Sequence, residues 1–228
     1  MAQIFHRSTN TVARVSIYGA LFSLLVLSFV LYGMSASPYF TDVNQPKDQP
    51  VPFSHRHHAG ELGIDCRYCH TSVEESSFAG LPPTKTCMTC HSQIWTNSAM
   101  LQPVRSSYAT GRSLEWIRVN ALPDFVYFNH SIHVRKGVGC TTCHGPVGEM
   151  PLTWKANTLQ MSWCLDCHRN PEKFVRRRED VFKPLYEPPD NQQELGAKLV
   201  KDYNIPSPAN CEHLKKCQMM TNCTTCHR

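Results

Sequence analysis

Apolar residues are scarce in this sequence for its length. They make up 41 % of the 228 residues, beside 16 prolines and 11 glycines, which is too little for an ordinary packed core. The sequence also lacks a glycine-rich nucleotide loop, a Ser/His/Asp grouping and any metal motif other than the one described next. These absences argue against a nucleotide-dependent enzyme or a serine hydrolase. We therefore expect a chain without a catalytic centre of its own, whose core is completed by something other than side chains.

Cysteine, in contrast, is abundant, and ten of the 12 cysteines lie in five Cys-x-x-Cys-His motifs. Two thiols three positions apart can each bond one vinyl group of a haem, and the histidine that follows is then held under the iron as the proximal ligand. A single copy could equally be a zinc or redox pair, but five copies predict five covalently bound haems c. The attachment residues are Cys66, Cys69, Cys87, Cys90, Cys140, Cys143, Cys164, Cys167, Cys223 and Cys226, and the proximal ligands are His70, His91, His144, His168 and His227.

Five haems within so short a chain set the expected fold class and compartment. We expect a mainly helical and irregular domain with little sheet, wrapped around the porphyrins. Covalent haem attachment takes place outside the cytoplasm, so Cys211 and Cys217 are expected to form a disulfide or to be buried free thiols. The formal charge of +5 largely balances the haem propionates, and nucleic-acid binding is not implied.

Residues 15–34 carry no charge and, as a helix, would span about 30 Å, the thickness of a bilayer core. Arg7 and Arg14 precede this stretch, and the next basic residue is Lys47. The positive-inside rule then predicts a cytoplasmic segment 1–14, a single transmembrane anchor and a periplasmic haem domain over 38–228, in the bacterial inner membrane. The alternative is a cleaved signal peptide, with the small residues 35–37 as the cleavage site.

The haem domain contains an internal repeat. A Phe-x-His-x-x-His block at 53–58 precedes two haem motifs, and a second block at 128–133 precedes two more. We read a first dihaem unit over 53–127, a second over 128–181, and a proline-rich strap with the fifth haem over 182–228.

The two blocks resemble the entry segment of multihaem cytochromes of the c3 and c7 type. This resemblance implies that the first histidine of each block is the distal ligand of the haem just downstream, and that the second histidine reaches a different haem. Carried over, His55 and His130 would serve the haems of the first and third motifs. His58 and His133 would serve haems elsewhere in the chain.

The fifth iron has no assigned distal ligand. Met161 is the favoured candidate, and Met220, His57 and His213 are the alternatives; a thioether ligand would raise the potential of that haem. Three further expectations concern local structure. We expect a helix over 95–118 with a break near 106–112, a solvated or propionate-pairing surface at 176–178, and an extended segment over 182–210.

The whole layout resembles the pentahaem subunit of alternative complex III, a bacterial quinol:electron-acceptor oxidoreductase of the respiratory chain. That resemblance implies a non-catalytic electron-transfer subunit. Its partners would be an iron–sulfur protein, polytopic quinol-binding membrane subunits and monohaem cytochromes. Electrons would pass to a periplasmic cytochrome or a terminal oxidase. One alternative is a stand-alone, membrane-anchored quinol dehydrogenase that feeds a periplasmic reductase. The other is a multihaem reductase with one open iron.

Overall fold

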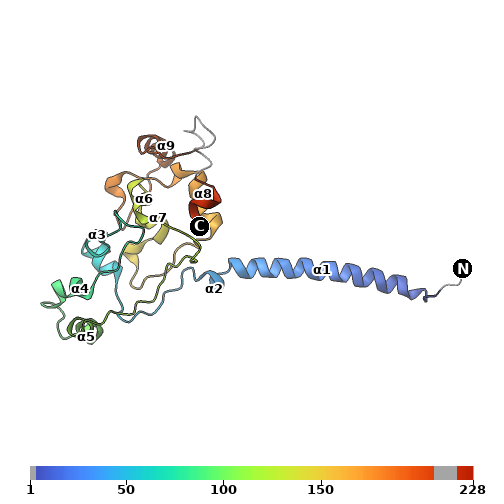
Figure 1. The fold of residues 1–228 in the computed structure, drawn as a ribbon, viewed down its shortest axis with the longest axis horizontal. Coiled ribbons are helices and arrows are strands. Elements are labelled where there is room, and N and C mark those ends of the chain that lie inside the picture. The colour runs from blue at the N-terminus through green and yellow to red at the C-terminus, as the bar shows by residue number, and fades with distance from the viewer. Residues whose placement is uncertain (1–3, 208–219, 228) are drawn as a thin grey trace. The chain divides into compact units, whose positions relative to one another are not determined.

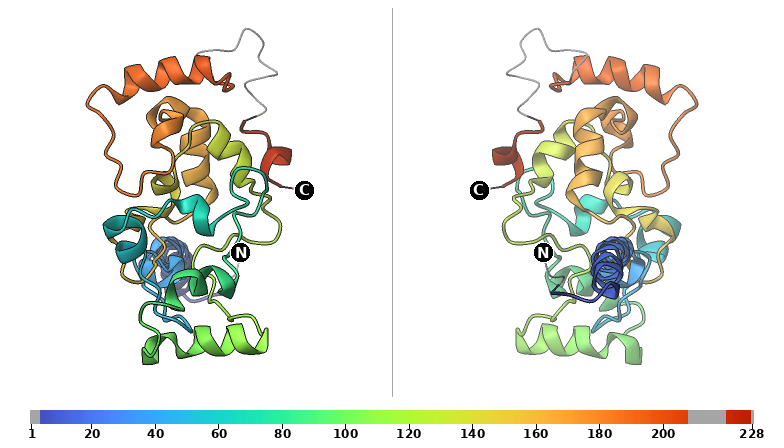
Figure 2. Two further views of the ribbon diagram at one scale, coloured as in Figure 1. Left: turned by 90° about the vertical axis from the view of Figure 1, so that its left-hand side faces the viewer. Right: turned by 90° about the vertical axis from the view of Figure 1, so that its right-hand side faces the viewer.

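The computed structural model describes residues 4–207 and 220–227, which form one long helix and a series of short helices joined by irregular loops (Figures 1 and 2). Within these residues there is no strand; three isolated β-bridges join Pro46 to Trp154, Val126 to His227 and Val138 to Val175. The expected fold class, mainly helical and irregular, is confirmed.

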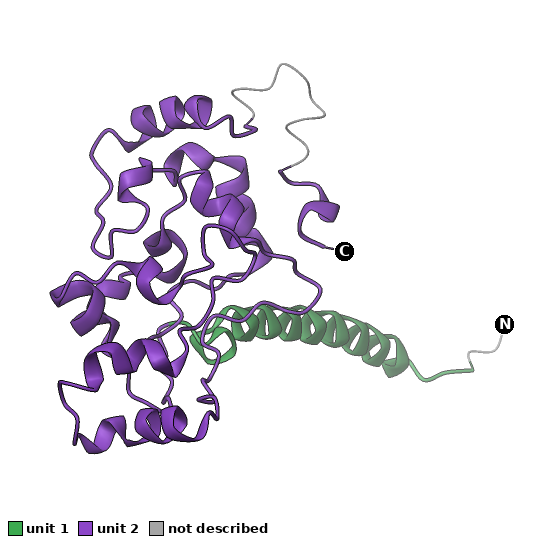
Figure 3. Cartoon of the chain, turned by 60° about the vertical axis from the view of Figure 1, so that its left-hand side comes forward, with its two compact units in different colours: residues 1–43 green, residues 44–228 purple. Residues whose placement is uncertain are grey.

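The chain divides into two compact units, Met1–Val43 and Asn44–Arg228 (Figure 3). The first holds the long helix α1, Ser8–Ala36, and the short α2, Pro38–Thr41. None of the side chains of α1 is buried. Its most apolar stretch has a mean hydropathy of 2.1, so α1 is long and apolar enough to cross a membrane. Such a helix suits either a membrane anchor or a signal sequence.

All five haem motifs lie in the second unit, each on a short helix. These helices are α3 (Cys66–Cys69), α4 (Thr84–His91), α7 (Cys140–His144), α8 (Met161–Arg169) and α11 (Cys223–Cys226). The two histidine blocks also lie on helical turns, a π-turn over Arg56–Glu61 and helix α6 over His130–Arg135. The remaining helices are α5, Gln102–Thr110, and α9, Gln192–Asp202. Single 3₁₀ turns complete the unit at Ala99–Leu101, Val147–Glu149, Pro171–Lys173 and Arg178–Asp180.

The apolar core of the second unit consists of three separate small clusters. One centres on Val175 and Val200, a second on Val51 and Val104, and the third on Val181. Each has three or four buried members. No single continuous core forms among the described residues, in line with the low apolar content of the sequence.

Three local expectations were wrong in part. The helix expected over 95–118 is α5 alone, because Gly111 takes a left-handed conformation (φ 71°) that ends it and no helix follows. The segment 182–210 is not extended throughout, because it contains α9. Within the run 176–178, Arg176 is only 4 % exposed and does not belong to a solvated face.

Candidate haem-binding site

The helical conformation of each motif brings its two cysteines to the same side. Residues three apart on a helix are neighbours, so a helical turn presents both thiols to one edge of a porphyrin. The turns are started by their own neighbours: Asp65 and Asn222 accept hydrogen bonds from backbone N–H groups of α3 and α11, at 2.8 and 3.3 Å. An acidic or amide side chain just before the first cysteine therefore fixes the motif locally.

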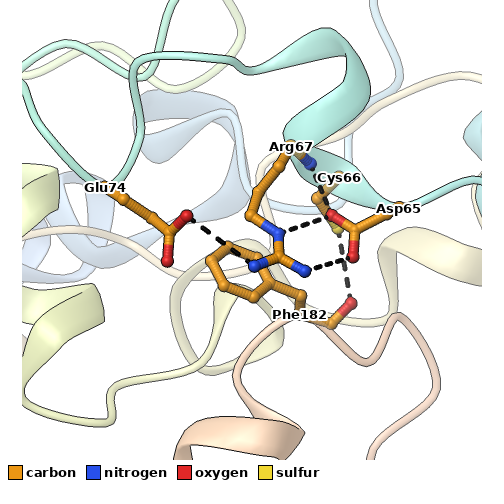
Figure 4. Close-up of polar contacts among 5 residues, drawn as sticks. All are labelled: Asp65, Cys66, Arg67, Glu74 and Phe182. Atoms are coloured by element: carbon orange, nitrogen blue, oxygen red, sulfur yellow. Dashed lines mark hydrogen bonds and ion pairs between the residues drawn. The ribbon is translucent and has the colours of Figure 1, made fainter.

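The first motif is held by an additional side-chain cluster (Figure 4). The Arg67 guanidinium donates to both carboxylate oxygens of Asp65, at 2.9 and 2.8 Å, and lies 3.7 Å from Glu74. It also stacks over the Phe182 ring at 4.4 Å, while the Cys66 thiol donates to the Phe182 carbonyl at 3.4 Å. Arg67 and Cys66 thus hold the first motif against Phe182, which lies more than one hundred residues later in the sequence.

The two Phe-x-His-x-x-His blocks have the same geometry. Phe53 meets His55 edge-on at 4.9 Å and stacks on His58 at 4.4 Å. Phe128 meets His130 at 4.8 Å and stacks on His133 at 4.4 Å in the same two orientations. In each block the phenylalanine therefore fixes both imidazole planes, and the repeat seen in the sequence is also a repeat of structure.

Each block histidine faces the histidine of one haem motif. The ring centroids are 6.5 Å apart for His55 and His70, and 6.4 Å for His130 and His144; in both pairs the rings are parallel to within 5°. The second histidines lie at similar distances but at larger ring angles: His58 lies 6.2 Å from His91 at an interplanar angle of 67°, and His133 lies 6.1 Å from His168 at 29°. Four histidines from the blocks thus pair one-to-one with four motif histidines.

The hydrogen bonds of these rings fix their tautomers. The Nδ1 atoms of seven of the eight paired histidines lie 2.6–3.3 Å from a backbone carbonyl or, for His55, from the Thr153 hydroxyl. A carbonyl only accepts, so in the six rings that are bonded to carbonyls Nδ1 carries the proton and Nε2 keeps a free lone pair. The Thr153 hydroxyl can either donate to His55 or accept from it. A carbonyl on the far nitrogen is also the usual way in which a metal-binding imidazole is oriented.

The electrostatic surroundings keep several of these imidazoles uncharged. Burial, with smaller contributions from neighbouring histidines, lowers the pKa of His55 and of His144 to about 4. Burial likewise lowers the pKa of His58 and His133, although a backbone hydrogen bond opposes it in each. At neutral pH these rings are therefore neutral, which is the form that binds a metal.

The described geometry fits an iron held between two imidazoles. Metal–imidazole bonds are about 2 Å long and a ring centroid lies roughly 1 Å behind its nitrogen, so two rings on one metal have centroids roughly 6 Å apart. The four observed separations of 6.1–6.5 Å agree with this value. The donor set, neutral imidazoles beside paired cysteines, is that of a bis-histidine haem c.

Comparison with known proteins supports the same family. Residues 34–108 match the class III cytochrome c family. The chain is also 32 % identical over 145 residues to the protein named menaquinone reductase, multiheme cytochrome c subunit, of Nitratidesulfovibrio vulgaris strain Hildenborough. That alignment covers 54 % of this chain and 69 % of the relative.

This chain belongs to the class III cytochromes c. Members of the family bind haem c covalently and transfer electrons, and the five Cys-x-x-Cys-His motifs of this chain contain the residue types that such attachment uses. The family match ends at residue 108, so it covers the first two motifs only.

The fifth motif histidine of this class III cytochrome c is placed differently. His227 points its Nδ1 at the Phe125 carbonyl, at 3.2 Å, and among the described residues its ring contact is with Phe125 at 5.8 Å. The favoured candidate Met161 is 64 % exposed at the start of α8, and Met220 packs against the cluster around Val175. His57 pairs with Glu61 at 3.0 Å instead. His213, Cys211 and Cys217 lie outside the described residues.

Sequence reasoning did not find the groups that orient the rings. They are the Thr153 hydroxyl and six backbone carbonyls, those of Ser54, Ser77, Gly80, Ile94, Asn129 and Met220. Any residue supplies a carbonyl, so a carbonyl partner leaves no signal in the sequence. Asn129 is an exception, because its side chain caps α6 at 3.3 Å and an Asn before a helical histidine pair is a recognisable signal.

Proposed function

We propose that this chain carries five haems c and is the electron-transfer subunit of a membrane-bound quinone oxidoreductase complex. The observation that carries the proposal is the set of four imidazole pairs at 6.1–6.5 Å, each joining a motif histidine to a block histidine. A chain with one haem site needs no such repetition, whereas an electron conductor needs several sites close together.

The pairs support the following proposed assignment of iron ligands. His70 and His55 would hold the first iron, and His144 and His130 the third, as the c3-type resemblance implies. His91 would share an iron with His58, and His168 with His133. His227 would be the proximal ligand of the fifth iron, with Met161 as its proposed partner. The domain division 53–127, 128–181 and 182–228 then corresponds to two dihaem units and one single haem.

The protein side of the chemistry follows from these contacts. A bound haem supplies a one-electron ferric/ferrous couple whose potential depends on its axial ligands and surroundings. The side chains hold the rings in place: Phe53 and Phe128 fix the imidazole planes, and backbone carbonyls fix the tautomers. Rigid six-coordinate ligation leaves no open position for substrate chemistry at four of the sites, so we propose a conducting rather than a catalytic role.

Two observations support a place in a quinone-linked membrane complex. The relative is named as a subunit of a menaquinone reductase. Helix α1 is able to serve as a single anchor, with Arg7 and Arg14 on the cytoplasmic side and the haem unit in the periplasm. We propose that the partners are polytopic quinone-binding subunits, an iron–sulfur protein and monohaem cytochromes.

The proposed function has two forms, which differ in whether electrons flow toward the quinone or away from it. The name of the relative favours electron flow toward menaquinone. The layout of one anchor, five motifs and two histidine blocks favours quinol oxidation, as in alternative complex III. Equilibrium titration of the haem potentials against the host's quinone decides between them, since electrons flow spontaneously from the lower to the higher potential.

The role as a subunit is tested by purification of the tagged chain from its host in mild detergent. We expect membrane and iron–sulfur subunits to co-purify, and we expect the haems to exchange electrons with a soluble menaquinol analogue within the complex. The chain purified alone in stronger detergent should not react with the analogue. Rapid menaquinol oxidation by the isolated chain would contradict the proposal and favour a stand-alone quinol dehydrogenase.

A further inference from the structure

Each histidine block joins two particular motifs. His55 and His58 lie three residues apart on one turn, yet their rings face His70 of the first motif and His91 of the second. The helices of the two motifs also touch directly, since the Tyr68 and Thr89 hydroxyls are 2.9 Å apart. The first and second motifs are therefore immediate neighbours.

The second block repeats this arrangement. His130 and His133 share helix α6 and face His144 of the third motif and His168 of the fourth. The third and fourth motifs are thus a second neighbouring pair.

The two pairs of motifs contact each other through the first and third motifs. The Cys66 thiol donates to the carbonyl of Phe182 at 3.4 Å, and the Cys140 backbone N–H donates to the carbonyl of Val181 at 3.2 Å. Both cysteines therefore contact the same two-residue segment, Val181 and Phe182. The Cys66 thiol also interacts with that of Cys140, which together with burial raises the pKa of Cys140.

The fifth motif is attached beside the fourth. The Nδ1 of His168 donates to the carbonyl of Met220 at 2.6 Å, and Met220 lies three residues before Cys223. The orienting partner of the fourth proximal histidine thus belongs to the entry of the fifth motif. Burial, and then the thiol of Cys226, raise the pKa of Cys164, which again places sulfurs of the two motifs near each other.

We infer that the five motifs form one unbranched row in the order second, first, third, fourth, fifth. The row rests on the axial-ligand assignment proposed above, and it differs from the order of the motifs in the sequence. Exposure agrees with it. Cys90 of the second motif and Cys223 of the fifth are exposed, whereas the other eight attachment cysteines are half-buried.

Exposed apolar side chains lie beside both ends of the row. Beside the second motif, Ile94, Trp95 and Met100 expose 51–64 % of their surfaces. Trp95 has a positive φ of 55°, a conformation that is rare for a bulky residue. Beside the fifth motif, Phe125 is 62 % exposed and its carbonyl holds His227. The first, third and fourth motifs lie between these ends.

The order is tested by removing the attachment cysteines of the second or of the fifth motif, the two ends of the row. Both variants keep the three interior haem sites. Two variants of the full-length, detergent-solubilised chain are compared, Cys87→Ala/Cys90→Ala and Cys223→Ala/Cys226→Ala. Mass spectrometry first counts haems in the parent and in each variant. A parent with fewer than five would contradict the proposed function itself, separately from the order.

Low-temperature EPR of the oxidised proteins then reports which irons are magnetic neighbours. We expect each variant to lose one ferric signal and to change the line shape or relaxation of one other signal. We also expect the affected signal to differ between the two variants. The row would be overturned if either variant changed two of the remaining signals, or if both variants changed the same one.

Discussion

At the scale of single residues, His57 and His58 are adjacent in the sequence and have opposite environments. His57 is half exposed and pairs with Glu61, whereas His58 stacks on Phe53 and faces His91. His58→Ala should leave one haem of the five without its sixth ligand. We expect one high-spin signal in the oxidised protein and CO binding to one reduced haem, measured by optical and EPR spectroscopy.

His57→Ala is the matched control for this prediction, since it removes an imidazole from the same turn. It should leave all spectra as in the parent protein. Equal effects of the two substitutions, or none from His58→Ala, would be inconsistent with His58 as an axial ligand.

Arg176 offers a second contrast between neighbours. Its guanidinium donates to the Thr141 and Thr142 hydroxyls at 3.0 and 2.7 Å and lies 3.9 Å from the centre of the Tyr186 ring. Arg176→Lys cannot reproduce this planar set of contacts. We expect a loss of about 1–3 kcal/mol in the free energy of unfolding, measured by thermal or denaturant unfolding of the holoprotein.

Arg177→Lys serves as the control for Arg176, because the Arg177 side chain is 60 % exposed and its ion pair, at 3.7 Å, is with Glu179, whose side chain is 71 % exposed. Its effect should stay within roughly 0.5 kcal/mol, as for most surface substitutions. A comparable loss in both variants would mean that the contacts of Arg176 contribute little.

The sequence identifies the residues that bind haem far better than those that support them. The paired cysteines, the motif histidines and the Phe-x-His-x-x-His blocks stand out, because their chemistry demands fixed residue types at fixed spacing. Arg176 does not, because an arginine within a run of three gives no sign that its side chain is buried. The pairing of His58 with His91 also needed the structure, since it depends on a long-range fold.

At the scale of secondary-structure elements, α9 docks on the 171–173 turn through a glycine. A Cβ at Gly196 would overlap the Glu172 carbonyl, and Gln192 donates to that same carbonyl at 3.1 Å. In a free helix Gly→Ala stabilises by about 1 kcal/mol. Here we expect the opposite sign, with Gly196→Ala lowering the melting temperature because α9 must shift away from its contact.

Ala197→Gly in the exposed part of the same helix provides the comparison. It should destabilise only by the intrinsic helix propensity, about 1 kcal/mol. If Gly196→Ala raised the melting temperature, close docking of α9 would be contradicted.

At this scale, the prolines of residues 182–210 led to the wrong prediction that the whole segment is extended. Pro184, Pro188 and Pro189 precede α9 and Pro206 follows it. They mark the ends of the segment rather than its interior, and residues 192–202 are mostly good helix formers. The break in the helix expected over 95–118 was recognisable, because Gly111 sits where the helix ends.

At the scale of the whole molecule, the packing of side chains against one another buries little surface. The accessible surface is 16204 Å² for a mass of 25.9 kDa, against roughly 10,500 Å² for a compact soluble protein of this mass. Helix α1 is exposed throughout and contributes to the excess. The three small clusters of the second unit fit a domain whose core is completed by porphyrins. The number of motifs and the apolar segment were readable from the sequence, but the spatial order of the motifs was not.

The role of α1 is tested by its replacement. If residues 1–36 are exchanged for a cleavable export signal, the haem unit should appear in the soluble periplasmic fraction. The full-length chain should stay in washed membranes, because transfer of so apolar a helix into lipid is strongly favourable. Recovery of a soluble protein shortened at its amino terminus from the full-length gene would instead identify α1 as a signal peptide.

The most direct test of the account is the intact mass of the mature polypeptide after denaturation, when only covalently held groups remain. The account predicts a single species that carries five thioether-linked haems. A mature chain with fewer than five haems, or with none, would contradict it.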